Sequence, residues 1–163
     1  MDTKRFALGF LLGLLLGVVA VVGYAASRLF AQPDITLAEM GLQDLEGRPV
    51  PAARLVGRPV VVNYWATWCK PCIEEFPDFA KAQAETGPGV ELVMISDEPA
   101  AKIRGFLKKH PYPFTFWRVR QPLPDVMARP CTYAFSRKGQ LVKKKAGTVE
   151  PALIREFITA ARK

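Results

Sequence analysis

The chain has 163 residues, of which 50% are hydrophobic and 23% are charged, and its formal net charge is +8 at pH 7. This composition is typical of one globular domain and excludes a disordered chain. The basic residues are scattered apart from the run 143–145, and no aromatic residues alternate with that run, so we expect a solvated face and no nucleic-acid partner.

The first predicted element is the uncharged, apolar segment 6–26. As a helix, a segment of this length is about 31 Å long, close to the hydrocarbon thickness of a bilayer, and it is predicted to be a transmembrane anchor. Lys4 and Arg5 precede it, so the positive-inside rule keeps residues 1–5 in the cytoplasm and the rest of the chain outside. A cleaved signal peptide is the alternative, because small residues at 23–25 resemble a cleavage site. Both interpretations place the folded part outside the cytoplasm.

Residues 27–34 are predicted to be a tether and residues 35–163 the folded domain. Turn signals at 47–49 and 57–59 predict short strands or a hairpin. The β-branched and aromatic run 59–66 predicts a central strand that is covered on both faces. Strands and helices then alternate, as in an α/β fold. The remaining predicted elements are helix 71–85, strand 90–96, helix 99–109, strand 114–119, strands 132–136 and 140–147 as a hairpin, and helix 151–162.

Cys69 and Cys72 are separated by only two residues. Cys69 falls where the predicted strand meets the predicted helix, and the free N–H groups and positive dipole at a helix start stabilise a thiolate. Lys70 adds a positive charge, and Pro71 suits the first helical turn. The thiolate is the attacking species in disulfide exchange, so Cys69 is the predicted nucleophile and Cys72 the resolving cysteine.

The cysteines fit other uses less well. A structural disulfide closing so short a loop adds little stability. A zinc site lacks ligands, since His110 is the one histidine and lies far along the chain, but Cys69, Cys72 and Cys131 together are candidate ligands for Cu(I) in a metal-assembly protein. A peroxiredoxin is disfavoured, because that family needs a threonine where this chain has Ala66.

The segment "VVVNYWATWCKPCIEEFPDF" resembles the active site of the membrane-anchored, thioredoxin-like thiol:disulfide oxidoreductases of the TlpA-like family, which include the reductants of cytochrome c maturation. Also in the family's order are "ITLAEM", the strand end at 96–97, "ARPCTYAFSRKGQLV" and "AGTVEPALIREFI", so the resemblance covers about residues 35–162. It implies a thioredoxin-like α/β fold, with a central mixed sheet flanked by helices, and a redox-active disulfide without a further cofactor.

The resemblance also implies partners and a location. The expected substrates are protein disulfides, for example those of apocytochrome c or another exported protein, and the expected electron donor is a transmembrane thiol relay. The expected location is a bacterial inner membrane, with a single span and the domain facing the periplasm or the cell exterior.

Several site residues follow from the resemblance. Trp68 matches the aromatic residue that flanks the nucleophile, and Pro77 matches the proline that bends the active-site helix. Pro130 matches the family's cis-proline, whose loop lies against the cysteines and binds the incoming peptide. Lys70 and Pro71 are expected to contact substrate as well.

Asn63 stands where thioredoxin has a buried aspartate, so the proton-transfer role passes to Glu75. Glu75 lies three residues after Cys72, on the same helix face, whereas Glu74 points away. A poorly hydrated pocket would raise its pKa and let it accept the proton of Cys72. The alternative is a solvated helix glutamate.

The two residues beside Pro130 are further candidates, and Cys131 departs from the family pattern. Cys131 replaces a threonine or another small residue, either as a buried apolar residue or as a third thiol that intercepts the mixed disulfide. Arg129 would lie beside the substrate's path and favour acidic or heme-propionate-bearing partners. The proline- and aromatic-rich segment 110–125 is either a partner groove or a rigid loop that leads into a strand.

Overall fold

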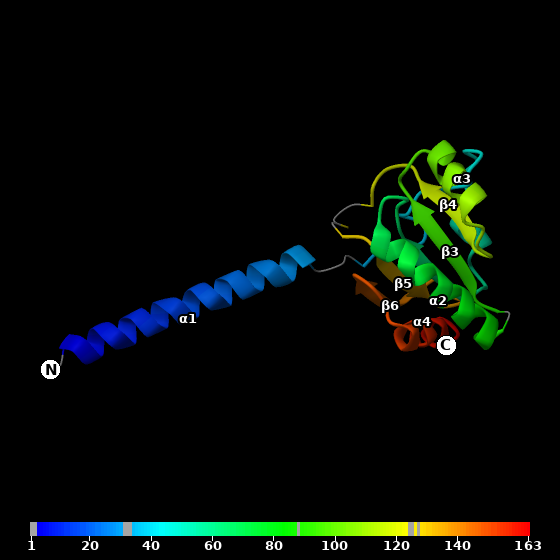
Figure 1. Cartoon of the computed structure of the whole chain (residues 1–163). Coiled ribbons are helices and arrows are strands. Elements are labelled where there is room, and N and C mark those ends of the chain that lie inside the picture. The colour runs from blue at the N-terminus through cyan, green and yellow to red at the C-terminus, as the bar shows by residue number, and fades with distance from the viewer. Residues whose placement is uncertain (1–2, 31–33, 88, 124–125, 127) are drawn as a thin grey trace. The chain divides into compact units, whose positions relative to one another are not determined.

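The computed structural model describes residues 3–30, 34–87, 89–123, 126 and 128–163 (Figure 1). The chain divides into two units, Met1–Ala31 and Gln32–Lys163. The first contains helix α1 (Thr3–Phe30), in which the stretch Gly9–Ala26 has a mean hydropathy of 2.3 and is long and apolar enough to cross a membrane. Its described side chains are apolar and exposed all round, as in helices that lie in lipid rather than in a protein core.

The second unit is built on a six-stranded sheet in the order β1-β4-β3-β2-β5-β6. The pairs β2–β3 and β3–β4 are parallel and the others are antiparallel, which confirms the predicted mixed sheet. The strands are β1 (Leu42–Gln43), β2 (Val60–Tyr64), β3 (Glu91–Ser96), β4 (Thr115–Val119), β5 (Cys131–Phe135) and β6 (Leu141–Ala146). The helices of this unit are α2 (Lys70–Thr86), α3 (Ala100–Lys109), α4 (Pro151–Ala161) and the short 3₁₀ helix η1 (Ala52–Arg54).

Strand β2 is buried along its whole length, as the continuous apolar run predicts. Its side chains alternate between two cores because successive residues of a strand point to opposite faces. Val60, Val62 and Tyr64 join the core beneath residues 35–55, whereas Val61 joins the core under α2, α3 and α4. The crossovers β2-α2-β3 and β3-α3-β4 proceed in one direction across the sheet. Since such connections share one hand, α2 and α3 lie on the same face, and both contribute to the same core.

The predicted helices and strands of the domain are confirmed to within one or two residues at their ends. The short strands expected beside the two turn signals also form, as β1 before the first and β2 after the second. β1 pairs with β4, and across the first turn it is joined by one bridge from Gln43 to Pro49 and by the N–H of Val50, which donates to the C=O of Leu42 at 2.9 Å. Pro49 and Pro51 lack N–H groups, so a regular ladder cannot continue through them.

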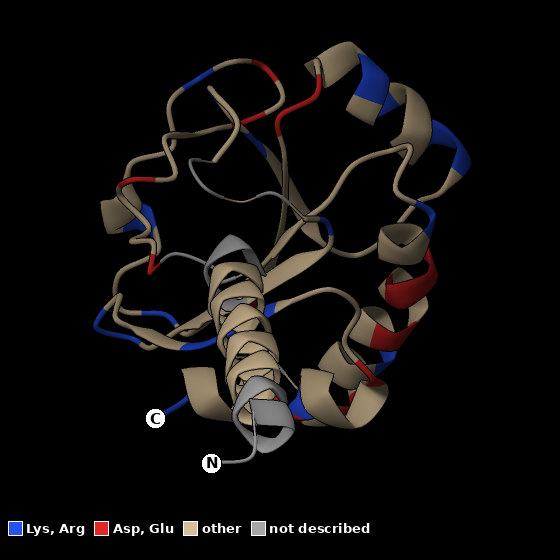
Figure 2. Cartoon of the chain, turned by 90° about the vertical axis from the view of Figure 1, so that its left-hand side faces the viewer, with Lys and Arg blue, Asp and Glu red and all other residues tan. Residues whose placement is uncertain are grey.

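The basic residues of the domain are distributed over several helices and loops (Figure 2). Within the lysine run on β6, Lys143 pairs with Glu156 at 2.6 Å and Lys144 with Asp34 at 2.5 Å. Acidic neighbours therefore balance part of this run, as expected of a solvated face.

An aromatic cluster joins α2 to the sheet and to the segment after α3. Phe76, fully buried, lies 5.1 Å from both Trp65 and Tyr112 and 5.7 Å from Phe114, measured between ring centroids. The first half of the segment 110–125 is therefore a rigid lead into β4, and its His110 stacks on Phe106 at the end of α3. The cluster fixes the helix that carries the cysteines.

We predict that Phe76→Ala lowers the free energy of unfolding by about 3–5 kcal/mol, because it leaves a cavity among the rings of Trp65, Tyr112 and Phe114. Urea unfolding of the full chain in detergent, followed by tryptophan fluorescence, measures this. Val142→Ala, at an exposed site on β6, is the control and should change it by less than about 0.5 kcal/mol. A loss below about 1 kcal/mol in Phe76→Ala would contradict the central position of this ring.

Candidate active site

Cys69 is the N-cap residue of α2 and is joined to Cys72 by a disulfide, with 5.3 Å between the two Cα atoms. Its Sγ accepts the N–H of Cys72 at 3.3 Å, and Pro71 lies in the first turn as predicted. The sulfur therefore faces the positive end of the helix, where a thiolate is stabilised. Cys69 is 4% exposed and Cys72 is fully buried, so Cys69 is the sulfur that an incoming group meets first.

Trp68 and Lys70 flank Cys69 and point outward. Trp68 is 64% exposed, although it is a large aromatic residue. Lys70 lies 3.6 Å from Glu74 across one helical turn, and both side chains are mostly exposed. An exposed aromatic ring beside a reactive sulfur offers an apolar surface to a peptide.

The predicted cis peptide bond between Arg129 and Pro130 is confirmed. Strand β5 begins at the next residue, Cys131, which pairs with Tyr64 at the end of β2. The loop that carries Pro130 and the loop that carries Cys69 therefore lie at the same edge of the sheet. The C=O of Pro130 accepts the N–H of Gly147 at 2.9 Å, which ties the loop to the end of β6.

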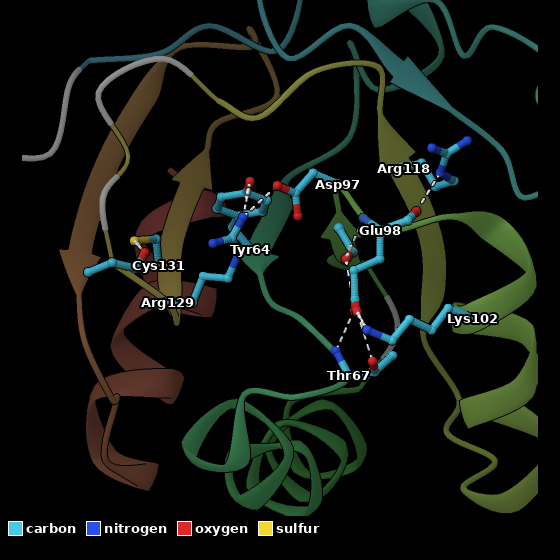
Figure 3. Close-up of polar contacts among 10 residues, drawn as sticks. Tyr64, Thr67, Asp97, Glu98, Lys102, Arg118, Arg129 and Cys131 are labelled. Atoms are coloured by element: carbon cyan, nitrogen blue, oxygen red, sulfur yellow. Dashed lines mark hydrogen bonds and ion pairs between the residues drawn. The ribbon is translucent and has the colours of Figure 1, made fainter.

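Arg129, which precedes the cis bond, has partners from two other loops at this edge of the sheet. Its Nη2 lies 2.7 Å from Asp97 and donates to the hydroxyl of Tyr64, and its guanidinium lies 4.3 Å from the centroid of the Tyr64 ring (Figure 3). The same group lies 5.5 Å from the ring of Trp68. Asp97 therefore balances the charge of Arg129, and the guanidinium contacts the aromatic rings on both sides of the β2–α2 loop.

Cys131 is fully buried and is not disulfide-bonded. Its Sγ donates to the C=O of Ala128 at 2.8 Å, and burial raises the pKa of its thiol to about 12. The thiol is therefore protonated near neutral pH, which favours the interpretation of Cys131 as a small buried residue.

Glu75 is buried, with 6% of its surface exposed, so the alternative of a solvated glutamate is wrong. Its Oε1 accepts the N–H of Val149, just before α4, while Oε2 is buried without a hydrogen-bond partner in the described part of the chain. Burial raises the pKa of Glu75 to about 7, although the Val149 N–H and the nearby Asn63 amide act against the shift. A carboxyl group of this pKa can both accept and release a proton at neutral pH.

Four contacts at this edge were not predicted from the sequence: those of Tyr64 and Asp97 with Arg129, of Val149 with Glu75, and of Glu98 with Thr67. The acidic pair at 97–98 directly after a buried strand was the available signal, because side chains that follow parallel strands gather at one edge of the sheet. Within the described residues there is no group of three His, Cys, Asp or Glu side chains placed to hold a metal ion, and Cys69 and Cys72 are joined to each other.

Comparisons with known proteins agree with this geometry. The AhpC/TSA family model matches residues 31–144. The chain is 28% identical over 158 residues to the thiol-disulfide oxidoreductase ResA of Bacillus subtilis (strain 168), covering 90% of this chain and 88% of that protein. It is 26% identical over 159 residues to the thioredoxin-like protein YneN of the same strain, covering 90% and 92%.

Solved structures share the fold. A thiol:disulfide interchange protein of the thioredoxin family from Chlorobium tepidum TLS matches with a TM-score of 0.63 and 22% identity, over 80% of this chain and 99% of that chain. A secreted Mycobacterium tuberculosis disulfide oxidoreductase homologous to E. coli DsbE matches with a TM-score of 0.61 and 21% identity, over 82% and 98%. The predicted thioredoxin-like fold is thereby confirmed.

The raised pKa of Glu75 makes stability depend on pH. The folded chain holds the proton up to about pH 7, whereas the unfolded chain releases it near the ordinary value of 4.5, so stability is lost as pH rises between these values. We predict that Glu75→Gln does not show this loss. The free energy of unfolding of the variant minus that of the wild type should therefore increase by about 3 kcal/mol between pH 4 and pH 8. Urea unfolding of the oxidised chain across this range measures it.

Glu74→Gln is the matched control, since Glu74 is the neighbouring glutamate on the exposed face. It should keep the wild-type pH dependence. If Glu75→Gln keeps it too, Glu75 titrates like an ordinary glutamate and the effect of burial is refuted.

Proposed function

We propose that this chain, which belongs to the AhpC/TSA family and is a thiol-disulfide oxidoreductase with the active-site pair Cys69 and Cys72, reduces disulfides of exported proteins. The observation that carries the proposal is the combination of Cys69 at the start of α2 with the buried Glu75 one turn beyond Cys72. The first stabilises an attacking thiolate, and the second provides a proton acceptor where water is scarce.

The reaction begins with both cysteines reduced. The thiolate of Cys69 attacks one sulfur of the substrate disulfide, which forms a mixed disulfide and releases the other substrate sulfur as a thiolate. The sulfur of Cys72 then attacks Cys69 and releases the second substrate sulfur. The substrate gains two electrons and two protons, and the Cys69–Cys72 disulfide present in the structure is the oxidised product.

Glu75 serves the second step. Cys72 is fully buried, so its proton cannot pass directly to bulk water. Glu75 follows one helical turn later. Its Oε2 has no hydrogen-bond partner among the described residues, so this oxygen can accept a proton or a new hydrogen bond. With a pKa near 7, its carboxylate accepts the proton of Cys72 and later delivers it to the departing thiolate.

Trp68, Pro130 and Arg129 form the surface that receives the peptide around the disulfide. Trp68 supplies an exposed ring, and the loop of Pro130 supplies backbone groups at the same edge. Lys70 and Pro71 follow Cys69 in the sequence and form the first turn of α2.

The setting proposed for this chemistry is the outer face of a bacterial inner membrane. Helix α1 is an apolar helix of the kind that serves as a signal anchor, and Lys4 and Arg5 before the apolar stretch favour a cytoplasmic N-terminus. The proposed substrate is apocytochrome c or another exported protein, and a transmembrane thiol relay returns electrons to Cys69 and Cys72. The family resemblance supports this direction.

Trapping tests the function and identifies the substrate. We predict that Cys72→Ser accumulates a mixed disulfide through Cys69, because the resolving attack is removed while the first attack remains. The full chain is expressed in bacterial membranes, and free thiols are blocked. Adducts that dithiothreitol cleaves by reduction are then identified by mass spectrometry. An exported cysteine-containing protein, with apocytochrome c as the favoured case, is the expected partner.

Cys69→Ser and Cys131→Ser are the controls for trapping. Adding Cys69→Ser to the trap should abolish every adduct, whereas adding Cys131→Ser should leave the adducts in place. Adducts that survive without Cys69 would show that the nucleophile is assigned wrongly.

Glu75→Gln tests the proton transfer. We predict that it slows resolution of the transient mixed disulfide about a hundredfold at pH 7, the lower end of general acid–base effects, and removes the dependence of this step on a group titrating near pH 7. Single-turnover mixing of the reduced chain with a disulfide peptide measures the step. If the titrations of both thiols and the resolution rate match those of Glu74→Gln, the role of Glu75 is refuted.

A further inference from the structure

The carboxylate of Glu98, in the loop after β3, binds the loop that carries Cys69. Glu98 lies two residues after β3 and is 7% exposed. Its Oε2 accepts the backbone N–H of Thr67 at 2.5 Å, and its Oε1 accepts the hydroxyl of Thr67 at 2.9 Å (Figure 3). Both carboxylate oxygens of Glu98 therefore bind Thr67, which lies two residues before Cys69.

The sheet explains why the contact forms there. Strands β2 and β3 are parallel, so the residues that follow them meet at the same edge. The N–H of Trp65 still bonds a strand acceptor, the C=O of Ile95 at 3.0 Å, and the N–H of Cys69 closes a turn onto the C=O of Ala66 at 3.0 Å. Thr67 lies between these two, and Glu98 supplies the acceptor for its N–H.

Glu98 is itself held firmly and charged. Lys102 lies 2.6 Å from Oε1, the backbone N–H of Glu98 bonds the hydroxyl of Ser96 at 3.2 Å, and Nε of Arg118 donates to its C=O at 2.7 Å. Burial alone would raise the pKa of Glu98, but the hydrogen bonds from Lys102 and Thr67 lower it below its ordinary value. The carboxylate is therefore a fixed acceptor whose charge Lys102 balances.

The restraint matters most when the cysteines are reduced. In the oxidised chain the bond to Cys72 ties Cys69 to the first turn of α2. Reduction removes that bond, and the sulfur must then stay at the helix start without it. The anchor at Thr67 is formed by hydrogen bonds that do not involve sulfur, so reduction of the disulfide breaks none of them.

We propose that Glu98 is a positioning residue for Cys69: acting through Thr67, it keeps the reduced sulfur at the N-terminus of α2. The inference rests on the proposed role of Cys69 as nucleophile. Without the anchor the thiolate leaves the N–H groups of the helix, so its pKa rises and the reduced state loses stability relative to the disulfide. The reduction potential accordingly becomes more negative.

This prediction differs from two simpler roles of Glu98. If the carboxylate acted only through its charge, neutralising it would lower the pKa of Cys69, because an anion disfavours a nearby thiolate. If it only stabilised the fold, its loss would weaken both redox states equally and leave the potential unchanged.

The test compares Thr67→Val with Thr67→Ser in the full chain in detergent, since both keep the net charge. Thr67→Val removes the hydroxyl bond and keeps the shape, whereas Thr67→Ser restores the hydroxyl. Alkylation of the reduced chain by iodoacetamide is followed against pH on the peptide that contains Cys69, and the potential is measured against glutathione. Thr67→Val should slow alkylation roughly tenfold at pH 7, raise its midpoint and make the potential more negative, because a bond to a charged group is lost. Thr67→Ser should remain close to the wild type.

The matched control is a second threonine–glutamate pair, in which Thr115 on β4 donates to Glu91 at the far end of β3, at 3.3 Å. Thr115→Val and Glu91→Gln should leave alkylation and potential unchanged. Glu98→Gln should change both in the same direction as Thr67→Val, and a lowered pKa of Cys69 in this variant would overturn the proposal in favour of a charge effect.

The outcomes separate this proposal from the proposed function. If Thr67→Val and Glu98→Gln both keep the alkylation rate and the reduction potential of the wild type while Cys72→Ser still traps a substrate, positioning by Glu98 is wrong and the function stands. If the wild-type Cys69 shows no reactivity with disulfides, the proposed function itself is wrong.

Discussion

The position of one sulfur atom at the positive end of a helix is the feature on which the rest of the site depends. Cys69 reaches that position because β2 ends at Tyr64 and a short loop leads directly into α2. The parallel pairing of β2 with β3 brings the residues after β3 to the same edge, and the antiparallel pairing of β2 with β5 brings the loop before β5 there too. Three loops that are distant in sequence therefore surround one disulfide.

The alternation of β2 serves packing and chemistry together. Residues 60, 62 and 64 fill one core, and residue 61 fills the other. The same alternation directs Asn63 to the face covered by α2, near Glu75, where its Nδ2 donates to Thr132 at 3.1 Å. An amide at this position adds no charge beside Glu75, so the acidic role is left to the helix.

Local patterns allowed most of the fold to be predicted, because β2, α2 and the paired cysteines each have a strong signal within a few residues. Glu75 and the cis bond at Pro130 were found through helical spacing and family resemblance. The contacts of Arg129 and Glu98 could not be found this way, since their partners lie 32 and 31 residues away and depend on which strands are neighbours. A sequence pattern likewise does not reveal that Asp97 faces Arg129.

Glu75 and Glu98 show how the surroundings give one residue type two roles. Both are buried glutamates near the cysteines, and each belongs to an acidic pair in the sequence. Glu98 has a cation and two donors from Thr67 within hydrogen-bond distance, which lower its pKa and make it a fixed acceptor. Glu75 receives one backbone N–H and no cation within ion-pair distance among the described residues, so burial raises its pKa to about 7. Only Glu75 can change its protonation state near neutral pH. Proton transfer therefore falls to Glu75 and positioning to Glu98.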